Sequence, residues 1–286
     1  MILPAGLTIA SMRSDEVVLL EEWATAEGWN PGLADLAIAH AVDADAFVAL
    51  RRDDELVGGG TIFSYDGQFG FMGLFIIRAD SRGAGLGAML WHHRLDLLRR
   101  RLGPGASIGM DGVLAMVPFY QKGGFRLAHG DLRFEGIARG ADDGDVQAYP
   151  QLSFGEIAAF DRRFVAAPRD RFLLRWLEQP GAHVLGLRQD CALAGYGVAR
   201  PCRRGFKLGP VFADGEAVAE RIVLALLSRI EGEAVALDVP EPNQAGLALA
   251  TRLGLRQSFG CARLYHGVAP NLPLSGIFGV TSFEFG

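Results

Sequence analysis

The sequence predicts an α/β protein that is built from two domains in tandem. Its 286 residues exceed the roughly 150 residues of a typical domain, so two domains are expected. In the first half, residues 71–88 combine a buried apolar strand, a glycine-rich loop and the start of an amphipathic helix. A similar order of elements begins again after residue 151. Repetition at the scale of a whole domain indicates that the second half is a copy of the first.

The pattern of the first half predicts two helices, a strand meander and then a strand–loop–helix unit. A capping serine followed by apolar residues spaced three and four apart indicates the first helix, and Gly28 ends it. Runs of β-branched and aromatic residues around the turn at 52–54 indicate a hairpin. In chain order, the expected elements are helices 14–28 and 34–42, strands 46–51, 55–64 and 70–77, helix 86–102, strand 106–110, helix 114–122 and a strand from 125.

The segment 136–151 is rich in glycine and acidic residues and lacks a periodic pattern, which is typical of an interdomain linker. We therefore expect domains at residues 1–139 and 150–286. In the second domain, Phe206–Phe212 takes the position of the strand 70–77. Its other expected elements are helices 153–164 and 171–178 and strands 183–188 and 191–199.

The glycine-rich loop Gly83–Ala88 has one clear physical use, because its N–H groups and the following helix N-terminus can bind phosphate oxygens. The segment also satisfies the dinucleotide pattern G-x-G-x-x-G/A, and Asp111 could serve as the acidic residue of such a site. That pattern requires its first glycine directly after a strand, whereas Arg78–Arg82 intervene here. A dinucleotide-dependent oxidoreductase is therefore the less favoured alternative.

A second motif, Val117–Phe125, carries one tyrosine on a short helix that a glycine pair ends. The two motifs in order, Arg-Gly-x-Gly-x-Gly/Ala and then Phe-Tyr-x-x-x-Gly-Phe, resemble the GCN5-related N-acetyltransferase (GNAT) superfamily over residues 45–135. The chain as a whole resembles a bacterial two-domain type with a divergent C-terminal domain, and Glu27–Leu33 and the tail Ile277–Gly286 support this. The resemblance implies that each domain is a mixed, mostly antiparallel sheet flanked by helices.

The same resemblance implies acetyl-CoA as cosubstrate and assigns roles to particular residues. Tyr120 would act as the general acid for the leaving thiolate. Residues 75–77 would offer backbone groups to the pantetheine arm, and the loop would hold the pyrophosphate. The cofactor-binding residues implied in this way are Phe75, Ile76, Ile77, Arg82, Gly83, Ala84, Gly85, Leu86, Gly87 and Ala88.

The second domain departs from this pattern at both motifs. Its loop, Ala213–Ala219, contains acidic residues where a phosphate would lie, and these would repel a pyrophosphate. The position of the tyrosine is occupied by Ala250. We therefore expect a degenerate copy that does not bind CoA in the usual way.

The acceptor is expected to lie near the turn after the first helix, where carboxylates could hold an ammonium group. The expected acceptor-binding residues are Glu27, Trp29, Asn30 and Asp35. The general base is left open, since the strand 71–77 carries no carboxylate; Asp111 either acts through water or belongs to a turn. The predicted activity is acetyl transfer to the primary amine of a small molecule, and a non-catalytic acyl-CoA sensor is the alternative from another class.

The composition of the chain limits its possible partners and its location in the cell. The net charge of −5 disfavours a nucleic-acid partner, and charged residues or glycine interrupt every apolar run before membrane-spanning length. The N-terminal residues show no export signal, and three cysteines without metal-ligand spacing indicate reduced thiols. We therefore expect a cytoplasmic protein, without a metal, that acts on a small-molecule amine as a monomer or homodimer.

Overall fold

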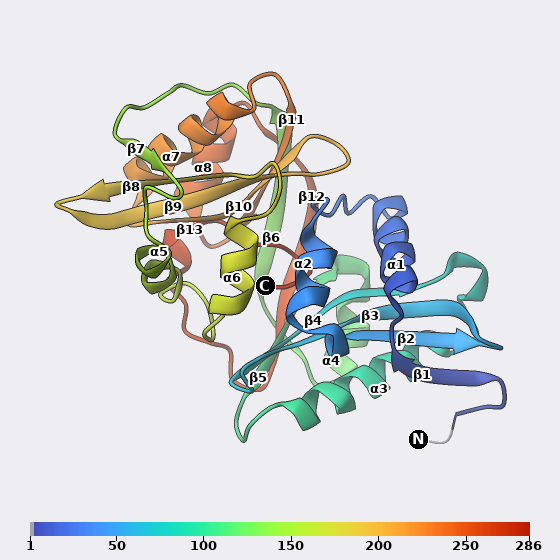
Figure 1. The fold of residues 1–286 in the computed structure, drawn as a ribbon. Coiled ribbons are helices and arrows are strands. Elements are labelled where there is room, and N and C mark those ends of the chain that lie inside the picture. Colours follow the sequence, from blue (N-terminus) through green and yellow to red (C-terminus); the bar gives the residue numbers. More distant parts are fainter. Residues whose placement is uncertain (1–2) are drawn as a thin grey trace.

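The computed structural model describes residues 3–286, and its two halves contain similar series of helices and strands (Figure 1). The elements of the first half are β1 (Leu7–Ser11), α1 (Ser14–Ala26), α2 (Asp35–Val42), β2 (Phe47–Arg52), β3 (Glu55–Tyr65), β4 (Phe69–Ile77), α3 (Leu86–Arg101), β5 (Ser107–Val113), α4 (Val117–Lys122) and β6 (Arg126–Ile137). The predicted helices and strands of this half are present, with ends that differ by a few residues.

The elements of the second half are β7 (Val146–Ala148), α5 (Phe154–Asp161), α6 (Asp170–Leu177), β8 (His183–Gln189), β9 (Ala192–Pro201), β10 (Phe206–Ala213), α7 (Glu216–Arg229), β11 (Ala234–Pro240), α8 (Gln244–Arg252), β12 (Arg256–His266) and β13 (Ile277–Gly279). The expected linker 136–151 begins too early, because β6 continues to Ile137 and β7 lies within that range. No helix within residues 3–286 is both long and apolar enough to cross a bilayer.

One mixed sheet runs through both halves. Its strand order is β1-β2-β3-β4-β5-β12-β6-β11-β10-β9-β8-β7, and β13 pairs with β10. The neighbours are antiparallel except for β4 with β5 and β10 with β11, which are parallel and occupy corresponding positions in the two halves. The long helices α3 and α7 make the two crossovers that parallel neighbours require. The expected mixed, mostly antiparallel sheet with flanking helices is therefore confirmed.

The two halves exchange their last long strands, which the sequence did not indicate. Strand β12 of the second half lies between β5 and β6, so that Ala262 is opposite both Gly112 and Gly130. Strand β6 of the first half pairs on its other edge with β11. Each half therefore completes the sheet of the other, and Figure 1 shows β6 and β12 at the junction between them.

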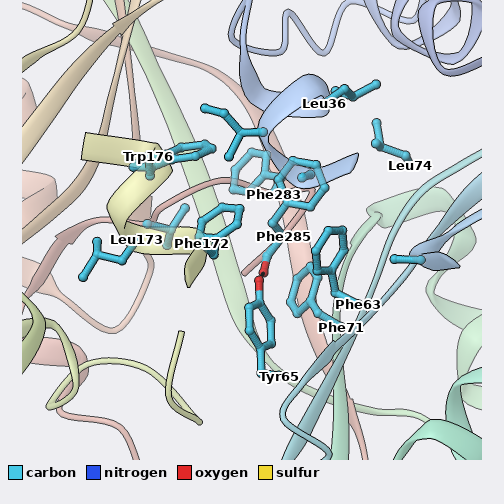
Figure 2. Packing of buried hydrophobic residues seen from close by; sticks show 14 of the residues in the cluster. Leu36, Phe63, Tyr65, Phe71, Leu74, Phe172, Leu173, Trp176, Phe283 and Phe285 are labelled. Atoms are coloured by element: carbon cyan, nitrogen blue, oxygen red, sulfur yellow. Dashed lines mark hydrogen bonds between the residues drawn. The ribbon is translucent and has the colours of Figure 1, made fainter. Parts of the chain in front are cut away.

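The C-terminal segment enters the core of the first half (Figure 2). The ring of Phe285 is fully buried, and its centroid lies 5.2 Å from that of Phe63 and 6.0 Å from that of Phe172 on α6. The hydroxyl of Tyr65 donates a 2.6 Å hydrogen bond to the carbonyl oxygen of Phe285. Side chains from both halves thus close around the tail, which fixes its path beside β4.

We expect Tyr65→Phe to lower the free energy of unfolding by about 1 kcal/mol, because it leaves the buried carbonyl of Phe285 without its donor. The ring contacts with Phe63 and Phe172 are retained. Urea denaturation would measure the change, with Tyr149→Phe as control, since that hydroxyl contacts Glu178 near the surface. Equal stability of the two variants would show that the hydroxyl of Tyr65 does not anchor the tail.

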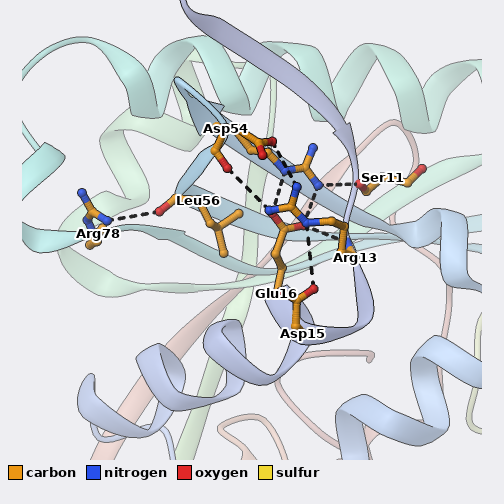
Figure 3. Close-up of polar contacts among 8 residues, drawn as sticks. Ser11, Arg13, Asp15, Glu16, Asp54, Leu56 and Arg78 are labelled. Atoms are coloured by element: carbon orange, nitrogen blue, oxygen red, sulfur yellow. Dashed lines mark hydrogen bonds and ion pairs between the residues drawn. The ribbon is translucent and has the colours of Figure 1, made fainter.

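Helix α1 is attached to the sheet through a buried carboxylate (Figure 3). Glu16 accepts hydrogen bonds from Nε and Nη2 of Arg51 at 2.6 and 2.5 Å, and from the amide of Arg13 at 2.7 Å. Burial opposes the charged form, but these bonds hold the pKa of Glu16 below its usual value. The pair fixes α1, and the turn that follows this helix carries Trp29.

Candidate active site

A cavity opens where β4 and β5 separate. Their parallel pairing ends with Phe71 opposite Gly109. Beyond this point a cavity of about 370 Å³ is lined by residues of both strands, together with the glycine-rich loop, α3 and α4. Residues of β12 and of the C-terminal tail also line it. The cavity is therefore built by both halves of the chain.

A bulge in β4 shapes one wall of this cavity. The pairing of β3 with β4 shifts between Gly59 and Thr61, and Leu74 at the bulge has a φ of 50°. For a residue with a side chain, such a left-handed conformation costs roughly 1–2 kcal/mol. Residues 75–77 follow the bulge, and all three line the cavity. The structure thus brings the residues expected at a pantetheine arm to the cavity wall.

The glycine-rich loop borders the same cavity. Gly83 and Gly85 have φ values of 82° and 77°, which residues with side chains rarely adopt. The first hydrogen bond of α3 runs from the amide of Met89 to the carbonyl oxygen of Gly85 at 3.2 Å. The helix N–H groups before Met89 therefore have no intrahelical acceptor, and they carry the positive end of the helix dipole.

The predicted loop residues divide into two groups. Arg82, Gly83 and Gly87 line the cavity. Ala84, Gly85, Leu86 and Ala88 do not, and the side chain of Leu86 is buried in the core. The guanidinium of Arg82 forms an ion pair with Glu27 and donates a 2.9 Å hydrogen bond to the carbonyl oxygen of Ile77. A cation is thereby held where the loop meets β4.

Tyr120 lies in the cavity wall on α4. Its ring centroid is 4.9 Å from that of Trp91 and 5.7 Å from that of Phe119. Burial raises the pKa of Tyr120 to about 12, although the positive charge of Arg94 acts in the opposite direction. At neutral pH the hydroxyl is therefore protonated and can donate a proton or a hydrogen bond.

Arg94 of α3 is a buried cation in the wall of the same cavity. Its Nη2 donates to the carbonyl oxygens of Thr61 at 2.5 Å and Gly73 at 2.7 Å, whereas Nε and Nη1 have no partner among residues 3–286. Burial lowers the pKa of Arg94 to about 9, so the group is charged at neutral pH. No motif in the sequence marked Arg94 as a site residue, because an arginine on a helix is usually exposed.

Asp111 lies within β5, so the interpretation of this residue as part of a turn is wrong. Its carboxylate accepts hydrogen bonds of 2.5 and 2.7 Å from Arg263 of β12. Arg263 also lies 3.6 Å from Asp131 of β6, measured from Nη2 to Oδ2. Burial raises the pKa of Asp111 to about 8, against the effect of Arg263 and with that of Asp131. The strand exchange brings these charges together.

The four residues expected to contact the acceptor separate in the structure. Trp29 and Glu27 line the cavity, whereas Asn30 and Asp35 do not. Asn30 forms hydrogen bonds of 3.1 and 3.2 Å with the backbone of the turn between β9 and β10. Asp35 is fully buried in an ion pair with Arg200 of β9 at 3.0 Å. Asn30 and Asp35 therefore join the two halves instead of lying at the site.

The second half contributes cavity residues that no sequence motif indicated. Phe259 and Cys261 of β12 and Phe283 and Glu284 of the tail line the cavity. The guanidinium carbon of Arg133 lies 5.6 Å from the ring centroid of Phe259 and 5.0 Å from that of Phe283. The resemblance of the tail to the two-domain type indicated that the tail matters in this fold. It did not indicate that the tail reaches the cavity of the first half.

In the second half, the chain itself occupies the corresponding gap between parallel strands. The pairing of β10 with β11 ends at Leu208 opposite Leu237, and β13 then pairs with β10 from Val211. The amide of Val280 donates to the carbonyl oxygen of Asp238 at 2.9 Å. The failure of this half to bind CoA stays a prediction, which the filled gap supports.

Two family models match the chain, one in each half. The model described as "Acetyltransferase (GNAT) family" matches residues 11–125, and the model described as "Acetyltransferase (GNAT) domain" matches residues 157–279. The chain belongs to the GNAT superfamily of acyltransferases. It is a tandem GNAT protein, as the two motifs and the repeat predict, and acyl-CoA is the cosubstrate class of this superfamily.

Relatives of known sequence cover most of this tandem GNAT chain. It is 26% identical over 276 residues to holothin acyltransferase of Pseudoalteromonas sp. (strain SANK 73390), which covers 95% of this chain and 92% of the relative. It is 23% identical over 195 residues to the uncharacterized N-acetyltransferase YitH of Bacillus subtilis (strain 168), covering 64% and 67% of the two chains.

Solved structures share the tandem fold. A putative acetyltransferase from Pyrococcus horikoshii matches with a TM-score of 0.85 at 22% identity, over 100% of this chain and 98% of that one. A tandem GNAT protein from the clavulanic acid biosynthesis pathway matches with a TM-score of 0.65 at 16% identity, over 93% and 99% of the chains. At these identities the likeness establishes the fold of the tandem GNAT chain.

Proposed function

We propose that this tandem GNAT protein transfers an acetyl group from acetyl-CoA to the primary amine of a small molecule. The observation that carries the proposal is a single cavity that joins Tyr120, residues 75–77 and the glycine-rich loop. The pyrophosphate would bind the free N–H groups of the loop, and the pantetheine arm would lie along residues 75–77 as an added strand. The relative named holothin acyltransferase supports a small-molecule acceptor.

The chemistry of the cavity suits a thioester. An amine attacks only as the neutral species, and the CoA sulfur, with a thiol pKa of about 8.5, leaves as a thiolate. Tyr120 would donate its hydroxyl proton or a hydrogen bond to this sulfur. The charge of Arg94, held without a carboxylate partner among residues 3–286, would stabilise the negative charge that develops on the sulfur.

Calorimetric titration of the full chain with acetyl-CoA, with NADH in parallel, tests the proposal. We expect acetyl-CoA to bind and NADH not to bind. Binding of NADH alone would overturn the assignment of the loop and favour the oxidoreductase. An acyl-CoA sensor would bind acetyl-CoA but release no thiol when amines are added, so an assay of thiol release separates that alternative from the enzyme.

Gly85→Glu is expected to weaken acetyl-CoA binding at least about tenfold, because it adds an acidic group at the phosphate site and a side chain at positive φ. Calorimetry would measure the dissociation constant. Gly105→Glu is the matched control, since Gly105 has a φ of 78° and, like Gly85, no atom within 4 Å of an added Cβ. Equal affinities of the two variants would contradict phosphate binding at the loop.

A further inference from the structure

We propose that Glu284 binds and deprotonates the ammonium group of an aromatic amine, in an acceptor subsite that both halves build. The inference rests on the proposed acyl transfer. The tail reaches this position because Gly73 of β4 has no side chain: a Cβ there would lie 2.0 Å from the carbonyl oxygen of Glu284. The tail thus brings a carboxylate to a strand that carries none between Phe69 and Ile77.

Glu284 is the carboxylate of the cavity that has no ion-pair partner within residues 3–286. Only 3% of this residue is exposed, and no hydrogen-bond donor in that part of the chain contacts its Oε2. The two other cavity carboxylates are engaged, Glu27 with Arg82 and Asp111 with Arg263. A buried carboxylate oxygen without a donor is costly, so a donor from a ligand would be favoured at Glu284.

Three buried cations lie within electrostatic range of Glu284, and each has a hydrogen-bond acceptor elsewhere. Arg133 pairs with Asp238 at 2.7 Å, Arg200 pairs with Asp35 at 3.0 Å, and Lys207 donates to the carbonyl oxygen of Trp29 at 2.9 Å. The two aspartates balance the two arginines. The charge of Glu284 therefore balances Lys207 at longer range, which permits burial while leaving Oε2 free for an ammonium group.

Aromatic rings gather at this end of the cavity. Trp29, Phe259 and Phe283 line it, and Arg133 connects them, because its Nη1 donates to the carbonyl oxygen of Trp29 at 3.0 Å while its guanidinium lies against both phenylalanine rings. Flat apolar walls with one free carboxylate fit a small aromatic ring that carries one amine. A polyamine would need several separated acceptors instead.

The protons of the reaction balance with two protein groups. Glu284 takes one proton from the ammonium group, and the neutral nitrogen forms a bond to the thioester carbonyl carbon. The carbon–sulfur bond breaks, and the sulfur receives the second nitrogen proton by way of Tyr120. Glu284 then releases its proton to solvent, so the products are the N-acyl amine, CoA thiol and one proton.

The first test uses the unmodified full chain saturated with CoA, which cannot react. Calorimetry would compare tryptamine with tryptophol, which has a hydroxyl in place of the amine, and with spermidine. We expect tryptamine to bind at least about tenfold more tightly than either compound. Equal or tighter binding of tryptophol or spermidine, or no binding of tryptamine, overturns the inference. Failure of CoA itself to bind would instead overturn the proposed function.

The second test measures acetyl transfer to tryptamine by Glu284→Gln. We expect kcat/KM to fall roughly 10- to 100-fold at neutral pH, because a charge-assisted hydrogen bond and a proton acceptor are lost. The loss should shrink as pH approaches about 10, where a growing fraction of the amine is neutral. The affinity for acetyl-CoA should not change. Unchanged kcat/KM overturns the role of Glu284.

Glu233→Gln is the matched control, because Glu233 is an exposed glutamate of the same half that does not line the cavity. We expect this variant to keep the kcat/KM of the unmodified chain. Thermal unfolding of both variants would show whether Glu284→Gln folds. If it does not, Glu284→Asp replaces it in the same assay: its carboxylate, one methylene further from the ammonium group, should lower kcat/KM by a smaller factor. The calorimetric comparison needs no variant.

Discussion

Arg263→Met is expected to lower the free energy of unfolding by about 3–5 kcal/mol, because it leaves two buried carboxylates without their cation. Arg263 is the hydrogen-bonded partner of Asp111, and it is one of two groups near Asp131. Both carboxylate oxygens of Asp131 are buried and accept no hydrogen bond from residues 3–286. Since Arg263 stands on β12 and the aspartates on β5 and β6, the variant also tests the exchanged strand.

The decrease in the free energy of unfolding of Arg263→Met should be larger at higher pH. Burial already raises the pKa of Asp111 to about 8 with Arg263 in place, and removing the cation would raise it further. Near pH 8 the folded variant then binds more protons than the folded unmodified protein, so its free energy of unfolding falls more steeply as pH rises. Urea denaturation at about pH 5 and about pH 8 should therefore show the larger deficit at the higher value.

Arg204→Met makes the same change in an exposed pair that also joins the two halves. Arg204 lies 3.3 Å from Glu135, and 69% of its side chain is exposed. Exposed ion pairs contribute about 1 kcal/mol or less, so this control should lose little stability. A similar small loss for Arg263→Met would contradict the buried cluster as a major source of stability.

The features that could be predicted from the sequence depend on residues close together in the chain. The loop Gly83–Ala88 has glycines where the backbone needs positive φ, and a helix starts directly after it. Tyr120 lies on a short helix that a glycine pair ends. These local patterns, with their order, were enough for the family, the mixed sheet and the place of residues 75–77 in the cavity wall.

The features that could not be predicted depend on contacts between segments that are far apart in the sequence. Strand β12 has the pattern of a last strand in its own half, and its apolar residues would suit either partner, so the exchange with β6 left no local signal. Asp111 looked like a turn residue because Gly112 follows it. Its partner Arg263 lies on the exchanged strand and was out of reach of any local pattern. The place of Glu284 in the cavity wall could not be predicted either, because it depends on the packing of the tail against Gly73 of β4.

This arrangement gives the second half a role that a degenerate copy would not have. Its own gap between β10 and β11 is filled by β13, yet β12 and the tail supply Phe259, Phe283 and Glu284 to the cavity of the first half. The glycine-rich loop and Tyr120 come from the first half alone. The second half thus shapes the cavity next to Trp29 and Arg133 of the first half, while the loop and Tyr120 depend on the first half.

Tyr120→Phe is expected to lower kcat for acetyl transfer by roughly 10²- to 10⁴-fold, the usual contribution of a positioned acid. The variant keeps the ring contacts with Trp91 and Phe119, so stability and acetyl-CoA affinity should not change. Complete proton transfer from a hydroxyl of pKa about 12 to a thiolate is uphill, since the CoA thiol has a pKa of about 8.5. The positive charge of Arg94 favours the phenolate, and the value of about 12 already includes this effect.

The assay of thiol release, with Tyr149→Phe as control, separates the two roles of Tyr120. That control also removes a hydroxyl, but one that lies near the surface against Glu178. Because the pKa of Tyr120 lies near 12, ionisation of this residue should not lower activity below about pH 10. If Tyr120→Phe turns over as fast as the control, water protonates the sulfur and the tyrosine serves only to pack α4 against Trp91.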